Sequence, residues 1–554
     1  MAASLAACAA VPSGTSAEAS SRPGDGPSVR VDRGIDEARR HLREVGLAET
    51  EALIDALVRF PTVRDSALGS AAPNAPAFRE MAAFLKKWSE DAGLTFNAVD
   101  GNEVWEISLG EGAPELAFVM HADVVPAGEP SGWTNPPFET TRVGDRIYGR
   151  GTEDDKGAIA ALLVVMRTLK QFGVTPGRRV VAVLGTGEES DWSGMKRYAS
   201  QVPPSTEVIS VDAGFPVVFG ENGFVAWKLR VPNDLGRSGS SRTSRTSRTS
   251  HSSRGPESSR REHCIPPVNV SGGEFLTQVP GEAWLDVESV MQGDRAFDVY
   301  AAAEAAAKAE RSARNKDVPP GDIAAFAVEV ERHEGRVRIV ARGKAVHSSI
   351  PEEGRNALWP LAGVAARLPL CQSGIERALV LVRDVFDGDD FGVRLGVAYS
   401  DPMMGRLVAA PTVLRLDGDH VELSVNMRRP AGRTDEAFHS MLDGALAKVR
   451  SGVDATFEEA GERYVGTPHV ADHESLMVRT LVDIYRELSG DHDAAPVSIR
   501  GGTYARLFKG AVNFGPSVPT LPYRGHAPDE YIERSSLSLM SRSLFEAIVR
   551  MRKS

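Results

Sequence analysis

The order of apolar and polar positions predicts a chain in which helices alternate with strands. Apolar residues recur at helical spacing in residues 78–92 and 156–172, and a glycine follows each stretch. Shorter apolar runs, which are typical of buried strands, lie at residues 116–120, 179–184 and 208–211. This alternation predicts an α/β fold, with a sheet covered by helices.

Polar residues with useful chemistry follow each of these predicted strands. His121 and Asp123 come directly after the first run, Glu188 and Glu189 follow the second, and Asp212 follows the third. The ends of strands along one edge of an open α/β sheet form its usual ligand site. We therefore expect these side chains to lie close together.

Two further candidates lie in loops. Asp154 stands in Gly149-Arg-Gly-Thr-Glu-Asp-Asp-Lys-Gly157, just before a helical stretch, and His526 stands in a loop rich in Pro and Gly. Imidazole and carboxylate groups are the ligands of zinc and of harder cations. The candidate metal ligands are His121, Asp154, Glu189, Asp212 and His526.

A pair of cations needs a bridging carboxylate to screen their repulsion, and each cation needs further ligands with one position left open for water. The neighbours Glu188 and Glu189 suit two different tasks. One carboxylate binds metal, and the other stays free to take a proton from the water.

Composition limits the other possibilities. With 554 residues the chain is expected to hold more than one domain, and its net charge of −11 disfavours nucleic acid as a partner. No apolar run is long enough to span a membrane. The three cysteines, at positions 8, 264 and 371, are scattered and odd in number. Neither a zinc knuckle nor a disulfide framework is therefore expected.

Two segments have the composition of disordered chain. Residues 1–29 are rich in small and polar residues, and residues 234–263 contain a repeated Ser-Arg-Thr. Within the first segment, Leu5-Ala-Ala-Cys8 resembles a bacterial lipoprotein cleavage box, although no basic segment precedes it. The expected location is therefore either the cytoplasm or the cell envelope, with a lipid anchor at Cys8.

As a set, the motifs resemble the co-catalytic zinc peptidase family that includes aminoacylase, carboxypeptidase G, carnosinase and the bacterial dipeptidase PepV. They occur in family order over about residues 35–550. The matching motifs are His121-Ala-Asp123-Val-Val-Pro126, Gly149–Gly157, Glu188-Glu189, Val211-Asp212-Ala-Gly-Phe-Pro216, Gly343-Lys-Ala-Val-His347, Arg428-Arg-Pro430, Gly501-Gly-Thr-Tyr-Ala-Arg506 and His526.

The resemblance implies a centre of two zinc ions, for which Co²⁺ or Mn²⁺ could substitute. Asp154 would bridge the two ions. His121 and Asp212 would complete one site, and Glu189 and His526 would complete the other. The resemblance also implies that the peptide bond between Asp154 and the next residue is cis.

The catalytic residues implied by the resemblance are Asp123, Glu188 and His347. Asp123 would hold the imidazole of His121 in place. Glu188 would act as general base and then as general acid. His347 would stabilise the oxyanion.

At the other end of the substrate, the resemblance implies a site for the terminal carboxylate. Arg428 would bind it in a fork geometry, with help from Thr503 and Arg506. The chain departs from the family at Thr277, where an Asn is usual. A hydroxyl makes fewer hydrogen bonds than an amide, which affects the expected substrate contact there.

The implied fold is a catalytic domain with a mixed central sheet flanked by helices, interrupted by an inserted α+β lid domain. Residues 30–222 and 434–554 would form the catalytic domain. Residues 223–433 would form the lid, interrupted by the Arg/Ser-rich insertion. This lid is about twice as long as a simple dimerisation lid, so the enzyme is expected to work as a monomer.

Three functions are the alternatives for this chain, and the residues favour them unequally. The stretches Gly132–Phe138 and Val211–Val217 are most similar to the dipeptidase branch, which favours a zinc-dependent dipeptidase acting on short peptides. A deacylase of N-acyl amino acids or a carboxypeptidase would use the same metal centre, because those substrates also end in a carboxylate. A non-catalytic binding protein would have lost a ligand or Glu188, and all of these residues are present.

Overall fold

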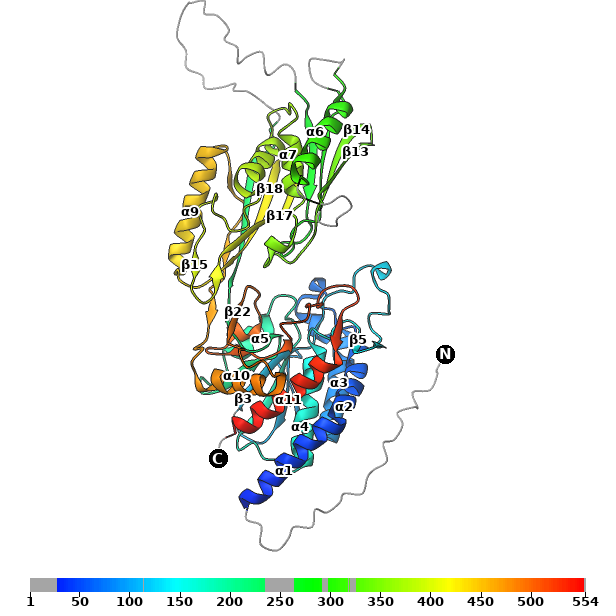
Figure 1. Cartoon of the computed structure of the whole chain (residues 1–554), viewed down its shortest axis with the longest axis vertical. Coiled ribbons are helices and arrows are strands. Elements are labelled where there is room, and N and C mark those ends of the chain that lie inside the picture. Colours follow the sequence, from blue (N-terminus) through cyan, green and yellow to red (C-terminus); the bar gives the residue numbers. More distant parts are fainter. Residues whose placement is uncertain are drawn as a thin grey trace, which may run out of the picture. The chain divides into compact units, whose positions relative to one another are not determined.

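A computed structural model describes residues 27–112, 114–234, 264–290, 297–316, 318 and 325–552 (Figure 1). The two segments predicted to be disordered lie outside the described residues, apart from their borders. These borders are residues 27–29, which begin the first helix, and Asp234. The chain divides into two compact units. One comprises Met1–Ala117, His121–Thr186 and Arg524–Ser554, and the other comprises Phe118–Met120 and Gly187–Tyr523.

A mixed sheet of nine strands is present, as the sequence predicts. Its order is β1-β2-β6-β3-β7-β23-β9-β21, with β22 also paired to β9. The β2–β6 pair is antiparallel, whereas β23 runs parallel to β7. The strands are β1 (Thr95–Val99), β2 (Val104–Leu109), β3 (Pro114–His121), β6 (Arg179–Gly185), β7 (Glu207–Ser210), β9 (Val218–Glu221), β21 (His469–Val470), β22 (Val497–Ile499) and β23 (Val512–Asn513).

The central helix of the first unit is α4 (Lys156–Gln171), which confirms the helical pattern of residues 156–172. Its residues Ala158–Met166 are all buried, and it packs against α2 and α11 (Figure 1). Among the described residues, six further helices do not belong to the hydrophobic cluster described below. They are α1 (Pro27–His41), α2 (Leu47–Val58), α3 (Pro76–Asp91), α5 (Ser193–Ala199), α10 (Leu476–Ser489) and α11 (Arg534–Arg550). No helix in the described ranges is long and apolar enough to cross a membrane.

A second sheet lies wholly within the second unit, and its neighbouring strands pair antiparallel. Its order is β13-β14-β12-β11-β17-β18-β10-β19, and β20 also pairs with β10. The strands are β10 (Gly223–Pro232), β11 (Pro267–Gly272), β12 (Glu282–Val287), β13 (Ala327–His333), β14 (Arg336–Arg342), β17 (Val408–Asp417), β18 (His420–Arg429), β19 (Glu458–Glu459) and β20 (Tyr464–Val465).

The core of this second sheet follows from strand alternation. In β10 every second residue is buried, and these residues are Val225, Trp227, Leu229 and Val231. They belong to a hydrophobic cluster shared with the helices α6 (Val299–Arg314), α7 (Leu358–Ala365), α8 (Gly374–Leu381) and α9 (Asp435–Gly452). Helix α6 packs against β13, and α7 packs against β12 and β14 (Figure 1).

Short elements complete the chain. The three-stranded sheet comprises β4 (Thr141–Val143), β5 (Arg146–Tyr148) and β25 (Tyr531–Glu533), and the two-stranded pairs are β8 (Ala213–Gly214) with β24 (Pro516–Ser517) and β15 (Ser400–Asp401) with β16 (Gly405–Arg406). The 3₁₀ turns are Ser66–Asn74, Pro130–Gly132, Pro351–Glu353 and Tyr504–Leu507, and the π-helical turns are Leu42–Gly46 and Val382–Phe386. A mixed sheet with helices and a separate inserted sheet together confirm the predicted fold class.

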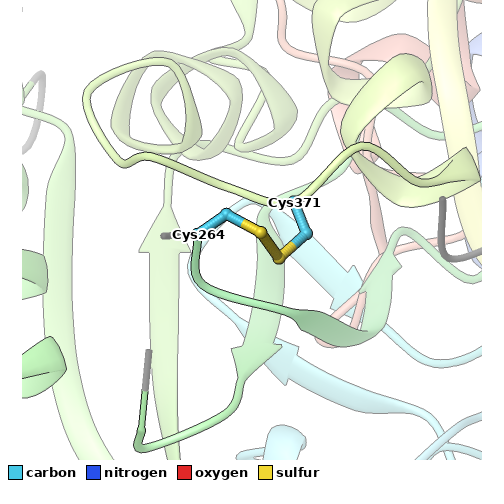
Figure 2. Close-up of a disulfide and its surroundings, with 2 residues drawn as sticks. All are labelled: Cys264 and Cys371. Atoms are coloured by element: carbon cyan, nitrogen blue, oxygen red, sulfur yellow. A yellow bond between two sulfur atoms is a disulfide. The ribbon is translucent and has the colours of Figure 1, made fainter. Parts of the chain in front are cut away.

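The expectation drawn from the cysteines is wrong, because Cys264 and Cys371 form a disulfide (Figure 2). The neighbouring residues Ile265 and Leu370 form a parallel bridge, and the N–H of Cys371 donates to the carbonyl of Ile265. These contacts bring together two cysteines that are 107 residues apart in the sequence. A separation of that length leaves no local pattern from which the pairing could be inferred.

Candidate metal centre and substrate site

Asp154 lies between two histidines. Its Oδ1 is 2.8 Å from Nε2 of His121, and its Oδ2 is 3.1 Å from Nε2 of His526. Burial alone would raise the pKa of Asp154, but the two imidazoles hold that pKa well below its ordinary value. A carboxylate that engages one imidazole on each oxygen has the arrangement required of a bridging ligand.

The local backbone explains how Asp154 reaches this position. It lies two residues before α4, and its peptide bond to Asp155 is cis, as expected. A side chain at Gly157 would place its Cβ 2.2 Å from the carbonyl oxygen of Thr152, so only glycine fits at this point of the turn.

His121 is the last residue of β3, and its ring is held by the residue two positions later. Its Nδ1 lies 2.9 Å from the carbonyl oxygen of Asp123 and 3.6 Å from Oδ1 of the same residue. When Nδ1 donates to the carbonyl oxygen of Asp123, Nε2 is left as the ligand atom. The expected partner of His121 is therefore in place, although its closest atom belongs to the backbone.

Three groups of side chains have ligand atoms that all lie within 4.8 Å of one another. The groups are His121 with Asp154 and Asp212, His121 with Glu188 and Glu189, and Asp154 with Glu189 and His526. Two donors on one tetrahedral zinc, each about 2.0–2.2 Å from the ion, lie roughly 3.4 Å apart. The nitrogen and oxygen donors in these groups are of the types that bind zinc, and their mutual distances of at most 4.8 Å allow them to share a metal ion.

The groups contain all five residues that the sequence analysis selected as ligands, together with Glu188. Asp154 occurs in two of the groups, with His121 in one and His526 in the other. Asp212 accompanies the first pair and Glu189 the second.

A comparison with protein families matches residues 117–550 to the model of peptidase family M20/M25/M40. The match covers more than three quarters of the chain, including every candidate ligand. The chain belongs to peptidase family M20/M25/M40. It is therefore a peptidase, and its substrates are peptides.

Relatives of this M20 peptidase cover most of its length. The putative dipeptidase YtjP of Bacillus subtilis is 29% identical over 476 residues, which is 85% of this chain and 89% of the relative. The Beta-Ala-Xaa dipeptidase of Lactobacillus delbrueckii subsp. lactis is 28% identical over 457 residues, which is 82% and 85% of the two chains.

Solved structures share the fold at low sequence identity. The di-peptidase Dug1p of Saccharomyces cerevisiae has a TM-score of 0.52 at 11% identity, covering 94% of this chain and 99% of its own. Human carnosine dipeptidase 1 has a TM-score of 0.50 at 13% identity, with 94% and 98% covered. These likenesses concern the fold alone.

Arg428 of this M20 peptidase is a buried cation with neutral hydrogen-bond acceptors. It is 5% exposed, and its nitrogen atoms donate over 3.2–3.4 Å to Asn426 Oδ1, the carbonyl of Arg500 and Ser348 Oγ. Burial, with a smaller contribution from Arg506, lowers the pKa of Arg428 to about 10. Within the described part of the chain, no carboxylate forms an ion pair with it.

His347 lies beside Arg428, with its Nε2 3.5 Å from Nη2 of the arginine. The segment of His347 pairs with the loop that contains Thr277. The N–H of Ser348 donates to the carbonyl of Thr277, and Gln278 forms a bridge with His347. The side chain of Thr277 itself is exposed. The structure thus brings together three positions that sequence analysis connected with the substrate.

Thr503 and Arg506 lie in a buried polar network. The hydroxyl of Thr503 donates to Glu221 Oε1 at 2.7 Å, and Glu221 is fully buried. Nη2 of Arg506 donates to the carbonyl oxygens of Asn222 and Thr467, at 3.0 Å each. Thr503 is therefore held by the Glu221 carboxylate and Arg506 holds neighbouring backbone, and the contact of both with substrate stays a prediction.

Three buried charged residues beside the candidate ligands are given no role by the sequence patterns above. Arg150 is 1% exposed and Glu530 is fully buried, and they form an ion pair at 2.7 Å. Glu153, which is 9% exposed, accepts hydrogen bonds from the backbone of Arg524 and Gly525. In the sequence all three resemble ordinary loop residues, because their partners are hundreds of positions away.

Proposed function

We propose that the protein is a zinc-dependent dipeptidase with two metal ions that share Asp154. The observation that supports this most directly is the pair of imidazoles, one on each carboxylate oxygen of Asp154. His121 and Asp212 would complete one site, and Glu189 and His526 the other. The grouping of their ligand atoms supports this assignment.

Bound zinc would supply Lewis acidity that polarises the scissile carbonyl and lowers the pKa of the attacking water towards about 7. Glu188 would take the proton of that water and deliver it to the leaving amine. Both glutamates occur in a ligand group with His121, but Glu189 alone of the two also occurs in the group of Asp154 and His526. This difference between adjacent carboxylates supports a division between proton transfer and metal binding.

At the C-terminal end of the peptide, Arg428 would bind the free carboxylate. Its guanidinium is buried and has neutral acceptors at 3.2 Å or more, so an arriving carboxylate would find an uncompensated positive charge. His347, next to Arg428, would donate to the oxyanion. Thr503 and Arg506 would keep the neighbouring backbone in place for the substrate.

The assignment to dipeptides rests on relatives that bear this name along most of the chain. A deacylase or carboxypeptidase would use the same residues, because its substrate also carries a terminal carboxylate. The two possibilities differ in whether the substrate needs a free α-amine.

The test is hydrolysis of a dipeptide panel by the purified protein, before chelation, after chelation and after return of zinc. Each dipeptide is compared with its N-acetyl form. We expect activity on the free dipeptides that is lost with the metal and restored by zinc. Faster hydrolysis of the N-acetyl forms would instead indicate the deacylase, and activity that survives complete removal of metal would contradict the proposal.

We also propose that residues 30–222 and 434–554 form the catalytic domain, that residues 223–433 form a lid, and that the enzyme is a monomer. The second sheet and its own hydrophobic cluster support a separate domain. Sedimentation of the active protein would test the monomer, because a stable dimer would give twice the mass.

A further inference from the structure

Two buried carboxylates close to the candidate metal ligands have no part in the mechanism above. Glu153 immediately precedes Asp154, and Glu530 follows His526 by four residues. They are 9% and 0% exposed. Burying a carboxylate is costly unless hydrogen bonds compensate for lost water, so the partners of these two groups indicate what they do.

Glu153 holds the loop that carries His526. Its Oε2 accepts from the backbone N–H of Arg524 at 2.6 Å and from that of Gly525 at 3.0 Å. These are the two residues that precede His526. The side chain of His526 is 47% exposed and its φ is 65°, an unusual value for a residue other than glycine. The loop therefore depends on such contacts to keep the imidazole in place.

Glu530 makes the reciprocal contact. Its Oε1 accepts from the backbone N–H of Glu153 at 2.9 Å and from that of Asp154 at 3.1 Å. Its Oε2 is 2.7 Å from Nη1 of Arg150. Each of the two segments thus provides a carboxylate that binds the backbone of the other.

We propose that Glu153 and Glu530 are positioning residues that lock Asp154 against His526 and thereby set the affinity of the metal site that these two ligands share. This inference rests on the proposed function, because it concerns the second of two zinc sites. Residues that orient metal ligands typically change metal affinity by about 10–100-fold when they are removed. The reciprocal contact gives a physical route to an effect of that size.

The two carboxylates should respond differently to the same substitution. Both backbone N–H groups that bind Glu153 donate to a single oxygen, so a glutamine of equal length can still accept them. Glu530 uses both oxygens, one for backbone N–H groups and one for Arg150. In Glu530→Gln the amide NH₂ would face either the guanidinium or the N–H groups, and neither of these accepts a hydrogen bond.

The experiment measures stepwise zinc affinities by competition with a chromophoric chelator, together with the visible spectrum of the cobalt-substituted protein. For Glu153→Ala and Glu153→Asp we expect the weaker site to lose about 10–100-fold in affinity, with a changed cobalt spectrum. Glu153→Gln can still accept from both N–H groups and should lose less affinity than these two variants, whereas Glu530→Gln should weaken the site. The Asp variant retains the charge but is one methylene shorter, so it also serves if the Ala variant does not fold.

Asp529→Ala is the matched control. Asp529 lies in the same loop and accepts from the backbone N–H and the hydroxyl of Thr134 at 2.8 and 2.7 Å. It should bind both zinc ions as the wild type does. An equal loss of zinc affinity in this control would overturn the proposed positioning role. Unchanged zinc affinities in Glu153→Ala and Glu153→Asp would overturn it as well. A wild-type protein that holds fewer than two zinc ions would instead overturn the proposed function together with the inference.

Discussion

Two buried arginines show how differently the candidate metal centre and the candidate substrate site are built. Arg150 is 1% exposed and pairs with the fully buried Glu530 at 2.7 Å. Arg428 is 5% exposed, and its hydrogen-bond acceptors among the described residues are neutral, at 3.2–3.4 Å. The first charge is compensated by a carboxylate, whereas the second has no such partner in the described part of the chain.

We interpret this difference as that between a charge with a structural role and a charge available to bind a ligand. Taking a guanidinium out of water without a partner costs free energy, and here the cost is visible in the lowered pKa of Arg428. A protein tolerates that cost where a ligand supplies the missing charge. On this interpretation the charge of Arg150 is balanced by Glu530 before any substrate arrives, whereas the charge of Arg428 would be balanced by the carboxylate of the substrate.

The largest effect is expected from a substitution that removes proton transfer and leaves the surroundings of both arginines unchanged. Glu188→Gln keeps the size of the side chain but cannot carry a proton, so kcat should fall by about 10²–10⁴-fold while KM and metal content stay unchanged. Glu189→Gln should lose metal as well as activity. Turnover of a dipeptide and elemental analysis are measured side by side. A Glu188→Gln enzyme with full metal and normal turnover would refute the assigned role.

The next largest effect is expected on stability, and it tests whether Arg150 stabilises the fold through its ion pair with Glu530. Arg150→Met leaves Glu530 buried without its partner, which typically costs about 3–5 kcal/mol of unfolding free energy. Arg428→Met is the matched control, because it removes a similarly buried guanidinium for which the described residues provide no carboxylate partner. The control should unfold at the same or higher denaturant concentration than the wild type. If both variants lose equal stability in urea titrations, the contrast between the two arginines is wrong.

The sequence predicted the residues of the site better than the contacts that hold them. His121 and Asp212 follow apolar runs directly, and Glu189 follows one within five residues, so each belongs to a local pattern of an apolar run with polar residues near its end. Glu530, by contrast, binds backbone 376 and 377 residues away. No local pattern distinguishes such an acid from a solvated one, and its role follows only from the folded chain.

The disulfide was missed for the same reason, because its two cysteines are far apart in the sequence. It leads to a prediction about the stability of the sheet that carries Arg428. Cys264 and Cys371 connect the start of β11 to the segment before α8, closing 107 residues. Cys264→Ser should lower the unfolding free energy by about 2–4 kcal/mol, because an open chain gains more entropy on unfolding.

Denaturant unfolding with and without reductant measures this effect. Cys8→Ser is the control, since Cys8 is the cysteine outside this pair. Reductant should destabilise the wild type and the control alike and leave Cys264→Ser unchanged. An equal response of all three proteins would mean that the bridge does not contribute to stability.

The smallest expected effect is on substrate binding, and it tests directly whether the carboxylate of the substrate binds Arg428. Arg428→Met should lower kcat/KM for a dipeptide by about 10–150-fold, which corresponds to the 1.5–3 kcal/mol of a hydrogen bond to a charged group. The loss should appear mainly in KM. The dipeptide amide, which lacks the carboxylate, should be a poor substrate of the wild type and should lose little more in the variant.

The pH dependence of KM is a second test of carboxylate binding by Arg428. Binding of a carboxylate needs the protonated guanidinium, and burial places the pKa of Arg428 at about 10. KM for the dipeptide should therefore stay constant below that pH and rise as pH passes through it, whereas KM for the amide should not. Because this pKa lies below its ordinary value, the charged form also costs stability below pH 10, and Arg428→Met removes that cost. Equal losses for acid and amide substrates would show that Arg428 does not bind the carboxylate.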